Sequence, residues 1–401
     1  MNSSKVLCRK VLHLSGKDTK AALQDFFSLL NDEQAKLLHF SQSCIHECLV
    51  INAEIEGESA EALVHKAGQF ASKHSLHLDV TDFTSPSRCE PTQGIWVTIL
   101  GDLSSALALT RISTVLVSQG LTISHVNAIG DDKMHGVHLL ATQYGEITQA
   151  NINRLRSDIL ALGTELKVDL AVQRDDVYRG SKRLLCMDVD STFVKGEFID
   201  ELAELCNVKS QVAEITARAM RGELDFEGSL RQRVQLLKGL PVSRARELCD
   251  RFELTPGAAD LVATVKQLGM RVGLVSGGFD FFVETLKSRF GLDFAFANEL
   301  EVLDDKLTGR VVGTVVDSAR KAQILKDMSH VFDIRLEQTI AAGDGANDIE
   351  MLKTAGLGIA YQAKPKLQEI ADTRFNQNDR LDTLLYLMGY DPKQLVRVCR
   401  R

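Results

Sequence analysis

The sequence predicts an α/β protein in which a Rossmann-like parallel sheet core with an inserted helical cap follows two α+β ferredoxin-like units. Two patterns carry this prediction. Residues 1–175 show the order βαββαβ twice, over 1–90 and again over 91–175. From residue 183 onward, short apolar runs alternate with helical patterns, which is typical of a parallel sheet. The length of 401 residues agrees with several domains, since one domain takes about 150 residues.

Composition and charge restrict the class of protein. The net charge of −7 argues against a nucleic-acid-binding surface. No apolar run approaches the roughly 18 residues that a membrane span needs, and the first residues lead into no signal-peptide core. The 8 cysteines include no CxxC pair, which favours reduced thiols. We therefore expect a cytoplasmic protein that binds neither nucleic acid nor membrane.

The elements of the two α+β units follow from period-2 and helical spacing of apolar residues. In residues 1–90, strands are expected over Val6–Leu14, Leu37–Phe40, Glu47–Ile55 and the alternating Leu76, Leu78 and Val80, and helices over Thr19–Asn31 and Ser59–His74. In residues 91–175, strands are expected over Trp96–Leu100, Leu121–Ile129, Val137–Tyr144 and Leu166–Val172, and helices over Ser105–Gln119 and Thr148–Leu162. Gly120 and Gly163 are expected to end these two helices.

A polar linker, Gln173–Lys182, separates the second unit from a C-terminal domain over 183–401. Strands of that domain are expected over Leu184–Met187, Val272–Val275, Thr339–Ala342 and Leu357–Ala360. The segment Phe198–Arg251 is helical in pattern and too long for a simple crossover. We expect it to form a helical cap, at about 198–251, beside a site.

Two carboxylates, Asp188 and Asp190, follow the first apolar strand. Ligands of open α/β sheets bind beyond the carboxyl ends of the strands, so these acids are candidate functional groups. A solvated strand end with a capping side chain is the alternative. The context of the later strands decides between the two.

Three further polar motifs follow in order. Ser276-Gly277-Gly278 leads into an expected helix over Phe279–Phe290, Lys321 opens a helix after Val311–Val316, and Gly343–Asp348 is a glycine-rich acidic turn. Alone, each fits a plain turn, a surface charge or a capped turn. Together, at strand ends of one sheet, they favour a shared site.

This mixture of side chains suits phosphoryl transfer. A carboxylate such as Asp188 can attack phosphorus and form an aspartyl-phosphate. Both groups are anionic, so a Mg²⁺ ion is expected between them, with Asp344 as a second carboxylate ligand. Lys321 and Ser276 can hold phosphoryl oxygens. Asp190 is placed to protonate the leaving oxygen and later to deprotonate water.

The motifs DVDST, SGG, Lys321 and GDGAND resemble the four motifs of the haloacid dehalogenase superfamily of phosphatases, across about residues 183–376. Within it, KGEFID and the run Ala219–Val234 resemble the phosphoserine phosphatase family. The resemblance implies Mg²⁺-dependent hydrolysis of O-phospho-L-serine to L-serine and phosphate, the final step of L-serine biosynthesis.

The resemblance also implies roles for single residues. Asp188 would be the nucleophile and Asp190 the general acid and base, and Mg²⁺ would be bound by Asp188, the Asp190 backbone carbonyl and Asp344, with Asp348 in support. The substrate-binding residues would be Glu197 for the ammonium group, Arg233 for the carboxylate, Met220 and Phe226 over the side chain, Gly277 through its backbone, and Ser276, Lys321 and Asn347 around the phosphate. Without the family context, Glu197 and Arg233 are typical helix-surface charges, and Met220 and Phe226 are typical of a cap core.

The two N-terminal units resemble ACT-type regulatory domains, which implies amino-acid binding at a subunit interface. An L-serine effector and a homodimer are therefore expected. The family's glycine-rich acidic loop is only partly matched by Gly16-Lys17-Asp18 and by Gly101–Ser105. A module used only for dimerisation or packing is an equal alternative.

Two other functions remain open. One is a haloacid dehalogenase-type phosphatase for another small phosphorylated metabolite. The other is an amino-acid-sensing regulatory protein with a vestigial phosphatase domain. The intact set Asp188, Asp190, Ser276, Lys321 and Asp344 argues against the second.

Overall fold

The computed structural model describes residues 8–17, 21–45, 47–57, 60–82, 93–101, 103, 106–131, 134–368 and 371–390. The chain divides into two compact units, Met1–Glu90 and Pro91–Arg401. Several predicted positions lie outside the described residues: Val6, Asp18, Thr19, Ser59, Asp102, Ser104 and Ser105.

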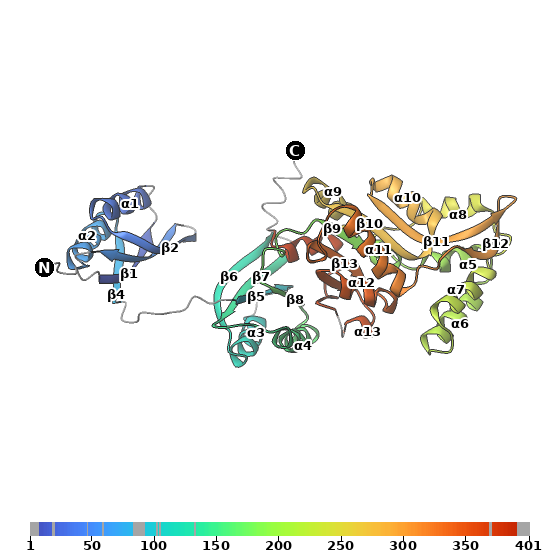
Figure 1. The fold of residues 1–401 in the computed structure, drawn as a ribbon, viewed down its shortest axis with the longest axis horizontal. Coiled ribbons are helices and arrows are strands. Elements are labelled where there is room, and N and C mark those ends of the chain that lie inside the picture. Colours follow the sequence, from blue (N-terminus) through green and yellow to red (C-terminus); the bar gives the residue numbers. More distant parts are fainter. Residues whose placement is uncertain are drawn as a thin grey trace. The chain divides into compact units, whose positions relative to one another are not determined.

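The first unit is a four-stranded antiparallel sheet of order β2-β3-β1-β4 with two helices (Figure 1). Its elements are β1 (Cys8–Lys17), α1 (Ala22–Asp32), β2 (Lys36–Ile45), β3 (Cys48–Gly57), α2 (Ala60–Lys73) and β4 (Leu76–Asp82). Alternate residues of β3 are buried, as expected for a strand with one face on a core. Phe26 of α1 and Phe70 of α2 pack on that face, with ring centroids 5.6 Å apart.

The second unit begins with the same order of elements. They are β5 (Gln93–Leu100), α3 (Leu107–Ser118), β6 (Thr122–Asp131), β7 (Met134–Gln143), α4 (Gln149–Leu166) and β8 (Asp169–Arg174). Thr148 caps α4 by accepting a hydrogen bond from the Asn151 N–H group at 3.2 Å. The strands pair in the order β8-β5-β7-β6, antiparallel throughout.

The remaining strands form a mostly parallel core of order β12-β11-β10-β9-β13-β14-β15 (Figure 1). The strands are β9 (Leu184–Met187), β10 (Arg271–Phe279), β11 (Phe294–Leu303), β12 (Lys306–Val312), β13 (Thr339–Gly343), β14 (Leu357–Tyr361) and β15 (Thr373–Phe375). The accompanying helices are α9 (Ala258–Gln267), α10 (Asp280–Phe290), α11 (Ser318–Val331), α12 (Ile349–Thr354), α13 (Pro365–Gln368) and the 3₁₀ segment η4 (Leu381–Met388). The parallel pairing of β9 with β10 and β13 confirms the predicted fold class.

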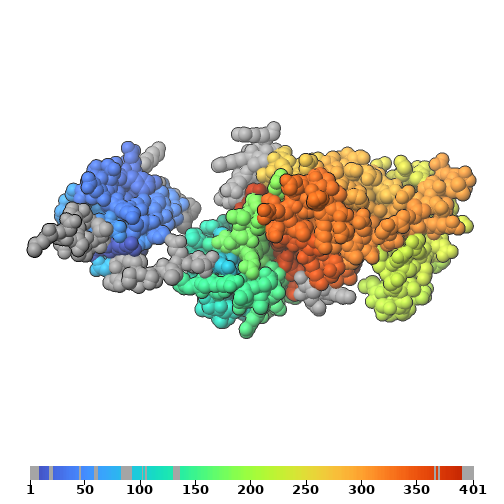
Figure 2. All heavy atoms as spheres, in the orientation of Figure 1, coloured from blue at the N-terminus to red at the C-terminus, as the bar shows by residue number. Residues whose placement is uncertain are grey.

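A helical segment leaves the core after β9 and returns before β10. It comprises α5 (Phe198–Leu205), α6 (Lys209–Met220), α7 (Phe226–Gln235) and α8 (Val242–Cys249). Backbone hydrogen bonds from Gly239 to Leu307 and from Val242 to Asp305 tie this segment to the β11–β12 hairpin. Figure 2 shows its yellow-green helices next to the orange hairpin.

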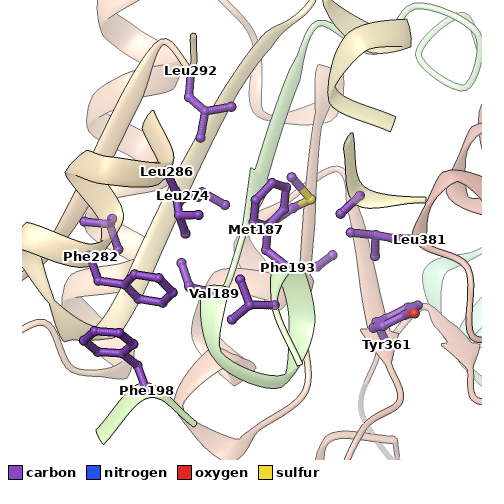
Figure 3. Close-up of a cluster of buried hydrophobic side chains, with 14 of the residues drawn as sticks. Met187, Val189, Phe193, Phe198, Leu274, Phe282, Leu286, Leu292, Tyr361 and Leu381 are labelled. Atoms are coloured by element: carbon purple, nitrogen blue, oxygen red, sulfur yellow. The ribbon is translucent and has the colours of Figure 1, made fainter. Parts of the chain in front are cut away.

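Apolar side chains fix the chain where the cap begins. Phe193 is fully buried, and the ring of Phe198 stacks on Phe282 of α10 with centroids 4.0 Å apart (Figure 3). The neighbouring Met187 and Val189 are buried as well. The loop after β9 is therefore held on both sides of the two candidate acids.

Two sequence expectations are wrong. Gly163 does not end a helix, because α4 continues to Leu166. A Cβ atom at Gly163 would lie 2.9 Å from the carbonyl oxygen of Val168, so glycine permits close packing there. Residues 313–316 are not part of a strand, since β12 ends at Val312 and runs antiparallel to β11. Lys321 therefore approaches the site from α11 and not from the end of a parallel strand.

The second α+β unit and the parallel core share one eleven-stranded sheet, because β15 pairs antiparallel with β8. Residues 91–401 accordingly form one compact unit. The predicted division of this unit into an α+β domain over 91–175 and a C-terminal domain over 183–401 stays a prediction. Among the described helices, none combines the length and hydrophobicity needed to cross a membrane.

Candidate active site

Asp188 lies at the carboxyl end of the central strand β9 and is 3% exposed. Its N–H group donates to the Ala342 carbonyl of β13 at 2.9 Å, which continues the sheet ladder to the edge of the site. The backbone then turns through Ser191, whose φ of 56° is the left-handed conformation of a tight loop. This turn directs Asp188 and Asp190 into one cavity.

Lys321 of α11 is completely buried and contacts two carboxylates. Its Nζ atom lies 2.7 Å from Oδ1 of Asp188 and 2.7 Å from Oδ1 of Asp348. Burial alone lowers the pKa of a lysine, but these two carboxylates raise the pKa of Lys321 above its ordinary value. Because an unpaired buried charge costs several kcal/mol, Lys321 remains protonated and fixes Asp188.

Three carboxylates could hold a metal ion together. Oxygen atoms of Asp188, Asp344 and Asp348 all lie within 4.8 Å of one another. Burial, followed by the charge of Asp188, raises the pKa of Asp344 to about 6 and that of Asp348 to about 7. Asp348 also accepts from Lys321 and from the Gly345 N–H group, so its oxygens are already engaged. Asp188 and Asp344 are the better placed of the three as direct ligands.

Asp190 is held apart from this cluster. Its Oδ1 atom accepts from the Phe198 N–H group at 2.7 Å, and its Oδ2 atom accepts from the Ser276 hydroxyl at 3.1 Å. Burial, followed by the neighbouring charge of Asp188, raises the pKa of Asp190 to about 6. A carboxyl group with this pKa can both give and take a proton near neutral pH.

The irregular end of β10, over residues 276–278, is fixed by a residue that the sequence did not indicate. Asn298 of β11 is 1% exposed. Its amide donates to the Gly277 carbonyl at 2.8 Å and to the Gly278 carbonyl at 3.2 Å, and its oxygen accepts from the Val316 N–H group at 2.8 Å. Asn298 thereby joins the Ser276 turn to the segment that precedes α11.

The acids lie on the floor of a cavity of about 820 Å³ whose opposite wall is the cap. Glu197 at the start of α5 is a half-exposed part of the wall, and Arg233 of α7 faces the same space. Burial raises the pKa of Glu197 to about 7, with Asp190 adding to the rise and Lys364 opposing it. Burial lowers the pKa of Arg233, while Glu197 and Asp200 oppose that shift. The cavity thus presents a carboxylate and a guanidinium group from the cap side.

Lys364, after β14, is a second residue that the sequence did not indicate. Its Nζ atom lies 3.1 Å from Oδ2 of Asp344 and 3.9 Å from Oε1 of Glu197. This ammonium group therefore bridges the carboxylate floor and the cap wall. It lies in the irregular segment between β14 and α13, and its residue type alone does not distinguish it from an ordinary surface lysine.

Most of the predicted site residues line this one cavity: Asp188, Asp190, Glu197, Met220, Phe226, Arg233, Gly277, Asp344 and Asn347. Met220 is 76% exposed, so it is a rim residue and not part of a cap core. Ser276 and Lys321 lie beneath the floor, where they contact Asp190 and Asp188. The Ser276 hydroxyl and the Lys321 ammonium group are both hydrogen-bonded to carboxylates of the site. Their contact with a phosphate stays a prediction.

The family of haloacid dehalogenase-like hydrolases matches residues 185–353. A phosphoserine phosphatase of Mycobacterium tuberculosis is 37% identical over 385 residues, which are 94% of this chain and 92% of that protein. A crystal structure of a probable phosphoserine phosphatase from Vibrio cholerae, in unliganded form, has a TM-score of 0.56 and 34% identity, covering 77% of this chain and 89% of that one. A haloacid dehalogenase-family hydrolase from Salmonella enterica serovar Typhi has a TM-score of 0.63 and 30% identity, covering 73% of this chain and 98% of that one.

Proposed function

Because the chain belongs to the haloacid dehalogenase-like hydrolases and, within them, to the phosphoserine phosphatase family, it is a phosphatase, and we propose that its substrate is O-phospho-L-serine. One observation supports this substrate most. The cavity that holds Asp188 and Asp190 also holds Glu197 and Arg233. A phosphorylated amino acid carries an ammonium and a carboxylate group, which these two side chains complement.

In the first step we assign Asp188 as nucleophile. One of its carboxylate oxygens forms a bond to phosphorus while the bond from phosphorus to the serine oxygen breaks. Lys321, at 2.7 Å, fixes the orientation of this carboxylate. Asp190 in its acid form gives its proton to the departing serine oxygen, so the leaving group departs as a neutral alcohol.

In the second step a water molecule attacks the aspartyl-phosphate. Asp190, now a carboxylate, takes a proton from that water while the bond between phosphorus and the Asp188 oxygen breaks. Hydrogen bonds from Phe198 and Ser276 hold Asp190 in place for both steps. Its pKa near 6 leaves both protonation states accessible.

The residues present fit a divalent cation. With every group ionised, the site gathers six carboxylates and three cations, which leaves an excess of three negative charges: Asp188, Asp190, Glu197, Asp200, Asp344 and Asp348 against Lys321, Lys364 and Arg233. We propose that Asp188, Asp344 and the Asp190 backbone carbonyl hold Mg²⁺, with Asp348 in support. When bound, the ion offsets the negative charge of phosphate and nucleophile.

The test measures phosphate release from O-phospho-L-serine by the wild type and by Asp188→Asn, with and without Mg²⁺. We expect Asp188→Asn to lower kcat by at least about a thousandfold, because an amide does not form the intermediate. Turnover near the wild-type rate would refute the mechanism. A panel of other phosphoesters separates phosphoserine from another small metabolite as substrate.

Four wider expectations remain proposals. We propose that residues 1–90 and 91–175 are ACT-like domains, that L-serine binds them as an effector, that the chain is a homodimer, and that it carries out the last step of L-serine biosynthesis in the cytoplasm. The ferredoxin-like order of strands in both α+β units supports the first of these. An L-serine titration that changes neither activity nor oligomeric state would refute the proposed role of L-serine as an effector.

A further inference from the structure

The cavity wall contains a polar atom that the proposed mechanism does not use. Ser229 lies on α7, is 2% exposed and lines the cavity. Its hydroxyl is buried and has no hydrogen-bond partner among the described residues. A serine within a helix commonly donates to the carbonyl four residues earlier. An unpaired buried hydroxyl lowers stability. A hydrogen-bond acceptor on a ligand in the cavity would offset that cost for Ser229.

The position of Ser229 indicates which ligand group could supply this partner. Ser229 lies four residues before Arg233, so both side chains are on the same face of α7. The Nε atom of Arg233 is also buried and without a hydrogen-bond partner in the described structure. Two unpaired donors therefore lie side by side on one cavity wall, and an acceptor with two oxygens suits such a pair.

The charges around the cavity favour a carboxylate at this place over a phosphate. The carboxylates of Asp188, Asp344 and Asp348 are clustered with Lys321 at the floor, where the phosphate is to react. Arg233 belongs to the cap, and two acids at the start of the cap, Glu197 and Asp200, line the same cavity. A ligand with its phosphate at the floor would bring its amino-acid end to the cap.

We propose that Ser229 contacts the substrate and donates a hydrogen bond to its α-carboxylate beside Arg233. The inference rests on the proposed function, because it takes the ligand to be a phosphorylated α-amino acid. Ser229 is then a specificity residue, since it distinguishes substrates with a carboxylate from those without one.

The test compares Ser229→Ala with a matched control on the neighbouring helix. Thr216 of α6 lines the same cavity, but its hydroxyl already donates to the Val212 carbonyl at 3.0 Å. Both variants, Ser229→Ala and Thr216→Val, are assayed with O-phospho-L-serine and with O-phosphoethanolamine, which lacks the carboxylate. We expect Ser229→Ala to raise KM for O-phospho-L-serine about tenfold with kcat little changed, a loss of about 1.4 kcal/mol. Its kcat/KM for O-phosphoethanolamine should stay at the wild-type value. Thr216→Val should leave KM and kcat unchanged for both substrates.

Thermal unfolding supplies a second readout. Because the hydroxyl has no partner in the part of the chain that the structure describes, Ser229→Ala should leave Tm unchanged or raise it. A lower Tm would mean that the hydroxyl has a structural partner, and it would overturn the inference. Equal effects on the two substrates, or an unchanged KM for O-phospho-L-serine, would also overturn it while leaving the proposed function intact. Absence of wild-type turnover with O-phospho-L-serine would overturn the proposed function first, and the inference with it.

Discussion

At the scale of single residues, Glu197 is the proposed ligand of the substrate ammonium, and its charge changes near neutral pH. Burial raises its pKa to about 7, Asp190 adds to the rise, and Lys364 opposes it. Only the deprotonated form attracts a substrate ammonium group. We therefore expect KM for O-phospho-L-serine to fall as the pH rises through about 7, while the KM for a phosphoester without an amino group stays level across that range.

Lys364 should set the position of this transition. Its ammonium group is 3.9 Å from Glu197, so Lys364→Met removes the charge that holds the pKa of Glu197 down. The fall in KM should then occur at a higher pH, and KM at pH 7 should increase several-fold. Steady-state kinetics between pH 6 and pH 9 measure both effects, with Lys353→Met on the exposed side of α12 as the control. An unshifted KM profile in Lys364→Met would contradict the assignment of Glu197.

At the scale of elements, the irregular end of β10 depends on Asn298 of β11. Asn298→Ala leaves the carbonyls of Gly277 and Gly278 and the N–H group of Val316 without their partner. Each unsatisfied buried group costs about 1–3 kcal/mol, so we expect the free energy of unfolding to fall by about 3 kcal/mol. Urea denaturation measures it, with Asn153→Ala on the exposed face of α4 as the control.

The same variant should reduce activity without changing specificity. Asn298 holds the segment in which the Ser276 hydroxyl donates to Asp190, and Asp190 acts on every phosphoester substrate alike. We therefore expect kcat/KM to fall by the same factor for O-phospho-L-serine and for a phosphoester without an amino-acid end. A loss confined to O-phospho-L-serine would contradict this positioning role.

The sequence predicts elements whose signal is local and misses those that depend on distant contacts. The apolar run Leu184–Met187 is β9 with the predicted bounds, and the acids after it are in the site. The strand β15 has three residues, too few for a period to be recognised, and Gly163 is typical of a helix end although its role is close packing against Val168. Asn298 and Lys364 gain their importance from partners on other elements, and Ser229 from the cavity that it lines, so no motif indicates them.

At the scale of the whole second unit, one sheet connects the α+β unit to the catalytic core. The connection consists of β15 against β8, with Thr373 opposite Ala171 and Arg374 opposite Leu170. An ion pair between Arg156 of α4 and Asp372, with atoms 2.6 Å apart, reinforces it. Such a short pairing has no sequence signal of its own. The two parts are nevertheless joined through backbone hydrogen bonds and not only through a linker.

Asp169 of β8 is the buried acid at this junction. It is 2% exposed, and its carboxylate accepts from the N–H groups of Asn376, Gln377 and Asn378 at 2.6–2.9 Å. Burial raises its pKa to about 6, although the three N–H groups oppose the shift. The next residues continue toward the site, because the Asn376 side chain accepts from the Ala363 N–H group, adjacent to Lys364.

This raised pKa predicts how stability depends on pH. An acid whose pKa is higher in the folded state binds more protons when folded, so its contribution is fully present below about pH 4 and is lost as the pH rises through about 6. The slope is at most about 1.4 kcal/mol per pH unit between those values. Asp169→Asn removes the titrating proton, so the difference in unfolding free energy between wild type and Asp169→Asn should change by about 2 kcal/mol from pH 4 to pH 6. Asp158→Asn on the exposed face of α4 is the control and should show no such change. If the unfolding free energies of Asp169→Asn and the wild type instead run parallel from pH 4 to pH 6, Asp169 is already ionised at pH 4 in the folded protein.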